Sequence, residues 1–117
     1  MFDIKAWERG AISSGQDEVY RELDRGRAWK VGVVARRAGT DRWDLLIEVI
    51  ILLFPEPPEV EIPRLEASLM CLKDLDALGY SLAHEDNGCV SCELKVTTKR
   101  FDEKRKKVLA ILDSTMG

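Results

Sequence analysis

Between residues 29 and 54 the chain places apolar side chains at every second position, apart from a polar interruption at 38–41. These positions are Trp29, Val31, Val33, Ala35, Trp43, Leu45, Ile47, Val49, Ile51 and Leu53. A period of two predicts two strands joined by a turn. Pairing Ala35 with Trp43 and Val31 with Ile47 keeps all of these side chains on one face. The other face of the second strand becomes apolar from residue 50 onward, which predicts that this end is covered on both sides.

Two further elements are predicted before this hairpin. Residues 1–7 alternate between apolar and charged side chains, a pattern that predicts a first strand. Ser13 and Ser14, followed by Gln16 and Asp17, resemble a capping box, and apolar residues then recur at helical spacing until Gly26. A short helix is therefore predicted at about residues 15–25.

All four prolines lie between residues 55 and 63, which predicts an extended, stiff connection. Residues 55–58 formally match the PxxP pattern of SH3 ligands, but no basic residue lies close by, so we interpret them as part of the rigid connector. Pro63 suits the first turn of a helix that ends at Gly79. One stripe of this helix is predicted to be buried, formed by Leu65, Leu69, Leu72 and Leu75.

A second hairpin and a last helix complete the pattern. Residues 80–85 and 89–96 alternate, and Asp86-Asn87-Gly88 between them is a strong turn signal with Gly88 in the left-handed conformation. This loop places Leu82 opposite Cys92 and His84 opposite Val90. Apolar residues at helical spacing then predict a helix at about 100–115.

The resulting order is βαββαββα in a single domain of residues 1–117. Its first six elements match the split βαβ pattern of ferredoxin-like domains, with one strand and one helix added. The alternative is a pair of ββα units, 28–79 and 80–117, on one sheet. Both interpretations give an α+β fold with helices on one face of a mostly antiparallel sheet. A topology of this kind hosts many functions, so it transfers none.

Composition restricts the class of protein. The chain has 117 residues, 18 Lys and Arg against 21 Asp and Glu, and a net charge of -3, as expected for one globular domain and not for a disordered or polybasic chain. The charged amino terminus does not resemble a signal peptide, and the apolar run at 45–54 spans about half of a membrane helix. Three cysteines without an export signal predict reduced thiols, a cytoplasmic location and no contact with membranes.

Cys89-Val90-Ser91-Cys92 has the spacing of a zinc or redox motif. Residues three apart in a strand point to opposite faces, so Cys92 is predicted to join the core while Cys89 points outward. His84 is the sole histidine and is predicted to be a partly buried strand residue. A metal or thiol site would need His84, Cys89 and Cys92 to converge with a fourth ligand such as Cys71. Buried structural thiols are the simpler interpretation.

Basic residues gather in two segments, with six between 25 and 42 and seven between 95 and 107, whereas 56–86 holds eight acids and two bases. If the first hairpin and the last helix lie side by side, they form a basic face that could bind nucleic acid. The candidate residues are Arg36, Arg37, Arg42, Lys99, Arg100, Lys104 and Lys107. The alternative is a solvated helix surface, because Glu103 and Lys107 have the spacing of a stabilising ion pair. Trp29 and Trp43 share the apolar parity and are predicted to be core residues.

No nucleophile motif, phosphate-binding loop or metal-binding helix signature is present, and no cofactor is expected. The missing motifs argue against an enzyme, although scattered carboxylates would leave no signature. The sequence therefore favours a cytoplasmic interaction module that binds another protein or forms a homo-oligomer through its sheet and its segregated charges. The alternatives are a small nucleic-acid-binding regulator and a thiol or zinc site at the Cys-x-x-Cys motif.

Overall fold

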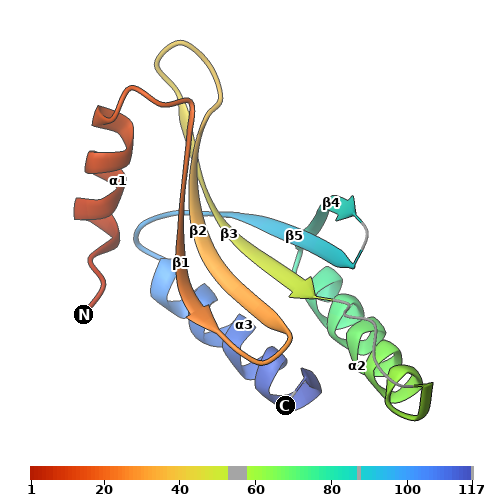
Figure 1. The fold of residues 1–117 in the computed structure, drawn as a ribbon. Coiled ribbons are helices and arrows are strands. Elements are labelled where there is room, and N and C mark those ends of the chain that lie inside the picture. Colours follow the sequence, from red (N-terminus) through yellow and green to blue (C-terminus); the bar gives the residue numbers. More distant parts are fainter. Residues whose placement is uncertain (53–57, 87, 117) are drawn as a thin grey trace.

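The computed structural model describes residues 1–52, 58–86 and 88–116, with 58–65 and 86 described as backbone only. Figure 1 shows the order of the elements, which are α1 (Ile4–Ser13), β1 (Glu18–Arg25), β2 (Trp29–Arg37), β3 (Trp43–Leu52), α2 (Pro58–Ala77), β4 (Ser81–Asp86), β5 (Cys89–Val96) and α3 (Phe101–Met116). The five strands form one antiparallel sheet in the order β1-β2-β3-β5-β4, which places β3 at its centre.

The β2–β3 hairpin agrees with the predicted strands and faces but differs in register. Val31 lies opposite Val49 and Ala35 lies opposite Leu45, whereas Ile47 and Trp43 were predicted as their partners. A shift of two residues preserves side-chain parity, so the same side chains still share one face. The alternation predicts which face is buried, and the length of the turn then decides the register.

All three helices pack against the same face of the sheet. The core joins Ile4 of α1, Leu75 of α2 and Phe101 of α3 to inward-pointing residues of the central strands. The strand residues that are at most 1% exposed on this face are Val31, Val33, Ala35, Ile47, Val49 and Ile51. The predicted α+β class, with helices on one face of an antiparallel sheet, is confirmed for the described residues.

The predicted strand at residues 1–7 is wrong, because this segment begins helix α1. Asp3 caps the helix, with its Oδ1 accepting a hydrogen bond from the Ala6 backbone N–H at 3.2 Å. Ile4 and Ala11 are buried and Trp7 packs against the core, as in an amphipathic helix. The apparent alternation covered only three apolar positions, too few to distinguish a period of two from one of 3.6.

The predicted helix at 15–25 is also wrong, because this segment forms edge strand β1. The capping-like serines belong to the end of α1, where the Ser14 backbone N–H donates to the Ala11 carbonyl and Gly15 follows with φ of 79°. Val19 then pairs with Ala35 of β2. A largely exposed edge strand needs little apolar alternation, so pairing with β2 outweighs the local helical spacing.

These two corrections change the topology. The observed order is αβββαββα, so the chain does not have the ferredoxin-like βαββαβ order. The two segments of the alternative interpretation keep their predicted order of elements, with β2, β3 and α2 in the first and β4, β5 and α3 in the second. Their hairpins meet through the pairing of β3 with β5.

Helix α2 begins at Pro58, five residues before the predicted start, so residues 58–63 are not an extended connection. A proline costs no hydrogen bond in the first turn of a helix, which allows this early start. The remainder of the predicted connector and most of the PxxP match, at 55–57, lie outside the described residues, as does the side chain of Leu65. The buried side is also rotated, because Leu69 is 65% exposed whereas Cys71 and Leu75 are fully buried.

The second hairpin is largely as predicted, and helix α3 agrees with the predicted range. Leu82 lies opposite Cys92, and Gly88 has φ of 81°. The register shifts between Leu82 and His84, so His84 lies opposite Ser91 and not opposite Val90. This irregularity moves His84 to the face opposite Leu82, where it is exposed and not partly buried.

Candidate functional site

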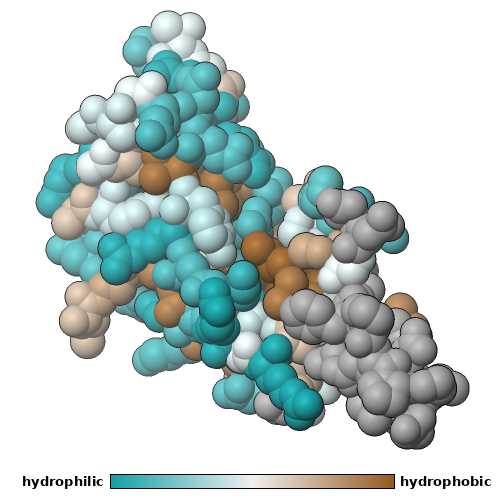
Figure 2. All heavy atoms as spheres, in the orientation of Figure 1, coloured by the Kyte–Doolittle hydropathy of each residue, from teal (hydrophilic) through white to brown (hydrophobic). Residues whose placement is uncertain are grey.

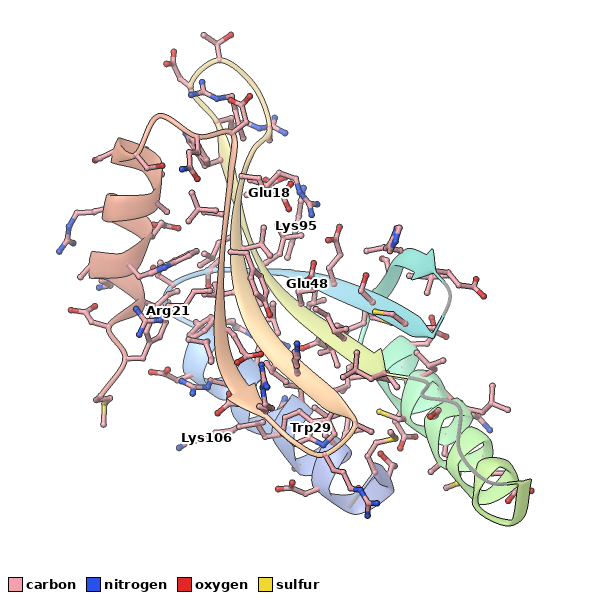
Figure 3. All side chains as sticks on the ribbon, viewed as in Figure 1. Glu18, Arg21, Trp29, Glu48, Lys95 and Lys106 are labelled. Carbon is pink, nitrogen blue, oxygen red and sulfur yellow. The ribbon has the colours of Figure 1, made fainter. Side chains whose placement is uncertain are left out.

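The face of the sheet that points away from the helices, here called the open face, carries most of the charged strand residues. Among the described residues, no helix packs on it. Its side chains include Glu18, Tyr20 and Glu22 of β1, Lys30, Val34 and Arg36 of β2, Asp44, Leu46, Glu48 and Ile50 of β3, and Ser91, Glu93 and Lys95 of β5. Figure 3 shows Glu18, Glu48 and Lys95 on this side and Trp29 on the helix side.

Arg36 connects three strands across the open face. Its guanidinium donates two hydrogen bonds to the Glu93 carboxylate, at 2.9 and 3.0 Å, and a third to Glu18 at 3.4 Å. The bidentate geometry is the strong form of this interaction. The hydrogen bonds to Glu93 raise the pKa of Arg36, so this arginine stays cationic while it binds Glu93 and Glu18.

Glu48 is the carboxylate at the centre of the open face. Its position lies between Gly32 of β2 and Glu93 of β5, and the Tyr20 ring lies so close over Gly32 that a Cβ there would approach within 2.3 Å. Burial raises the pKa of Glu48, and the charges of Glu93 and Glu18 raise it further against the opposing effect of Arg36. Burial is the largest of these effects, and His84 opposes the two carboxylates together with Arg36.

A groove of about 340 Å³ lies on the open face near the start of β4, and we call it the edge groove. Leu46, which is 4% exposed, lines it together with two ion pairs. One pair is Arg36 with Glu93, and the other joins Lys95 Nζ to Asp44 Oδ2 at 3.4 Å. Gly79 and Ser81 line the same groove beside the last residues of β5. It therefore combines an apolar lining, charges of both signs and a sheet edge.

The open face becomes apolar toward the end of β3. Ile50 and Leu52 are half-buried there, and Figure 2 shows hydrophobic surface over this part of the strand beside a largely hydrophilic region. The prediction that both faces of this end of β3 are covered depended partly on Phe54, which lies outside the described residues.

A second exposed surface is apolar and belongs to α2 and β4. Leu69 and Met70 on α2 are 65% and 60% exposed, and Leu82 on β4 is 61% exposed. The two elements lie on the same side of the molecule, and α2 extends away from the sheet (Figure 1). We call Leu69, Met70 and Leu82 the exposed apolar surface.

The candidate thiol residues do not converge. Cys92 is 5% exposed in the core as predicted, whereas Cys89 is half-buried on the other face of β5. Burial raises the pKa values of Cys92 and Cys71, which disfavours their thiolate forms. No group of three or more His, Cys, Asp or Glu residues within the described part of the chain could hold a metal ion. The three cysteines are unpaired thiols.

The basic residues of the first hairpin are mostly occupied by acidic partners. Arg36 belongs to the open face, and Arg37 contacts Asp17 at 2.9 Å while its guanidinium lies 5.0 Å from the centre of the Trp43 ring. Trp43 is therefore half-buried, whereas Trp29 is buried as predicted. Arg42 is exposed in the turn of this hairpin.

The basic residues of α3 lie elsewhere. Figure 1 shows the turn of the β2–β3 hairpin and helix α3 at opposite ends of the view, so the basic residues at this turn do not lie beside α3. Lys107 pairs with Glu103 at 3.3 Å, the ion pair predicted from the spacing. Lys99, Arg100 and Lys104 form no ion pair with another described residue.

Comparison of the chain with protein-family models, curated proteins and solved structures finds no match. No described helix has the length and apolar character needed to cross a membrane.

Sequence patterns did not indicate the two surfaces described above. Glu48 was visible as a polar position on the second strand, but its proximity to Glu93 depends on the pairing of β3 with β5, which no local pattern encodes. Leu69 was assigned to the buried stripe. The better signal was the spacing of Ser68, Cys71, Leu72 and Leu75, a helical i, i+3, i+4, i+7 pattern that includes a small polar residue.

Proposed function

We propose that this protein is a non-catalytic interaction module that pairs with a second copy of itself through its exposed apolar surface. The observation that carries the proposal is the outer side of α2, where Leu69 and Met70 are 65% and 60% exposed while Cys71 and Leu75 on the inner side are fully buried. Large apolar side chains gathered at an exposed surface are characteristic of interaction sites.

The shape of the molecule supports pairing through α2. The principal extents of 50 × 27 × 24 Å reflect an elongated protein, and α2 extends beyond the sheet where a second helix can reach it (Figure 1). In a two-fold dimer each residue contributes twice, so Leu69 alone supplies two buried side chains. At about 1.5–3 kcal/mol for each buried leucine, loss of both weakens the dimer by at least about 100-fold.

Sedimentation velocity over a range of concentrations tests this proposal. We expect the wild-type protein to pass from monomer to dimer, and Leu69→Lys and Met70→Lys to remain monomeric. Ile12→Lys is the matched control, because Ile12 is an apolar helix residue that is 39% exposed on α1. A wild-type protein that stays monomeric at about 200 µM, well above the dissociation constants of stable dimers, would refute the proposal. A dimer retained in Leu69→Lys would refute the assigned surface.

Nucleic-acid binding is a second candidate function, favoured by two cations just before α3. Lys99 and Arg100 are exposed and form no ion pair with another described residue. Binding of this kind weakens steeply with salt, and Lys99→Glu with Arg100→Glu should abolish it. Absence of binding to mixed short RNA and DNA at low salt would remove this candidate.

A further inference from the structure

The outer side of helix α2 carries four exposed side chains in a row, here called the outer stripe. They are Glu66, Leu69, Met70 and Lys73, and their spacing of i, i+3, i+4 and i+7 places them on one face of the helix. The opposite side of α2 packs against the core. The outer stripe therefore has two apolar residues at its centre and one charge at each end, an acid before them and a base after them.

The two charges of the outer stripe are not used elsewhere in the fold. Glu66 and Lys73 are exposed, and neither forms an ion pair with another described residue. They are seven residues apart, roughly 10 Å along the axis at 1.5 Å per residue, so they cannot pair with each other. Lys73 is also the one cation among the side chains that the structure describes on α2. Both charges are therefore available to a second molecule.

We propose that the outer stripe pairs with the outer stripe of a second copy in the antiparallel direction, so that Glu66 of each copy binds Lys73 of the other. This inference rests on the proposed self-association, and it adds the orientation of the two helices and the residues that select it. A two-fold axis between Leu69 and Met70 sets these two residues opposite each other at the centre. The same symmetry then brings Glu66 opposite Lys73 twice.

Charge favours the antiparallel direction over the parallel one. Parallel α2 helices would set Glu66 beside Glu66 and Lys73 beside Lys73, and like charges at facing positions repel. The antiparallel direction turns both contacts into ion pairs at the rim of an apolar centre. Asp74 and Asp76, the other acids among the described side chains of α2, lie beyond the overlap of 66–73 and do not enter these contacts.

The shape of the molecule agrees with this direction. Helix α2 meets the sheet at its carboxyl end, close to β4, whereas its amino end at Pro58 extends away from the sheet (Figure 1). The outer stripe lies near the middle of this 20-residue helix. Two antiparallel copies therefore place their sheets at opposite ends of the helix pair, where the sheets do not compete for the same space.

Sedimentation velocity of charge-reversal variants of the full chain tests the inference. Glu66→Lys and Lys73→Glu each convert two ion pairs of the dimer into two repulsive contacts, so each should weaken dimerisation at least about fivefold. The double variant that carries both substitutions restores the pairs with the charges exchanged and should dimerise within about twofold of the wild type. An equimolar mixture of the two single variants should also dimerise, because one supplies two cations and the other two acids.

Two substitutions on α3 are matched controls for the change in net charge. Asp113 and Lys106 are exposed and lie outside the outer stripe. Asp113→Lys changes the net charge as Glu66→Lys does, Lys106→Glu changes it as Lys73→Glu does, and both should dimerise as the wild type does. Salt at about 1 M, where the Debye length is about 3 Å, should reduce the difference between the single variants and the wild type. Circular dichroism verifies the folding of each variant.

Each result supports or overturns the inference. Weakened single variants together with a restored double variant support it. Single variants that dimerise like the wild type overturn it, because a parallel pair only exchanges one repulsion for another. A double variant as weak as the single variants overturns the assigned ion pairs.

Failure of the proposed self-association gives different results. In that case the wild-type protein stays monomeric, or Leu69→Lys still dimerises. If only the antiparallel pairing is wrong, the wild-type protein dimerises and Leu69→Lys does not, while the charge reversals have no effect or are not rescued by the double variant. The two failures are therefore distinguishable.

Discussion

Helix α2 offers a matched pair of substitutions that tests which of its sides is buried. Leu75 is fully buried in the core, whereas Leu69, six residues earlier on the same helix, is 65% exposed. Leu75→Ala and Leu69→Ala make the same chemical change in the same helix, so the difference in helix propensity cancels between them. The remaining difference in stability reports burial.

The expected magnitudes are well separated. Truncation of a buried leucine loses the transfer free energy of the removed atoms and leaves a cavity, so Leu75→Ala should lower the free energy of unfolding by about 3 kcal/mol. For a chain of this length that corresponds to a decrease in Tm of about 12 °C, at about 4 °C per kcal/mol. Leu69→Ala should change the free energy of unfolding of the monomer by less than about 0.5 kcal/mol.

Urea unfolding followed by circular dichroism at several protein concentrations measures both effects. The loss in Leu75→Ala should be independent of concentration, because it belongs to the monomer core. Any effect of Leu69→Ala should appear only where the wild-type midpoint depends on concentration, as expected for a residue in a dimer contact. Equal losses in the two variants at the lowest concentration would refute the assignment of the buried side of α2.

Three further predictions concern single groups. Glu48→Gln should increase stability at pH 7, because the raised pKa means that ionised Glu48 is less favourable in the folded protein than in the unfolded chain, and the gain should vanish below about pH 4 where the carboxyl is protonated in both states; a gain that grows toward acid in matched urea titrations would contradict it. Tyr80→Phe should leave the free energy of unfolding unchanged or raise it by up to about 1 kcal/mol, because the buried Tyr80 hydroxyl has no hydrogen-bond partner among the described residues; a decrease in the free energy of unfolding would contradict it. In the native protein a thiol reagent should modify Cys89 first, with Cys71 and Cys92 reacting only after unfolding, because burial raises the pKa of both; peptide mapping identifies the order.

The parts of the fold that were predictable are those in which local pattern and tertiary packing agree. The β2–β3 hairpin has a long run of one parity, and α3 has apolar residues at helical spacing together with an acid-first ion pair between Glu103 and Lys107. The amino-terminal third was not predictable in this way. Phe2, Ile4 and Ala6 fit a period of two, and Val19, Tyr20 and Leu23 fit a helix, until partners elsewhere in the chain are known.

The open face shows why the candidate site could not be read from the sequence. Glu18, Glu48 and Glu93 are separated by 30 or more residues, and they share one environment only because β1, β2, β3 and β5 lie side by side in that order. Arg36 was predicted from the sequence as one of several basic candidates for nucleic-acid contact. In the structure its guanidinium pairs with Glu18 of β1 and Glu93 of β5, so it joins strands of the sheet. A count of basic residues measures charge before pairing, whereas recognition depends on the charge that remains after pairing. On the open face the charges of Glu93 and Glu18 act on Glu48, and just before α3 the cations Lys99 and Arg100 form no ion pair with another described residue.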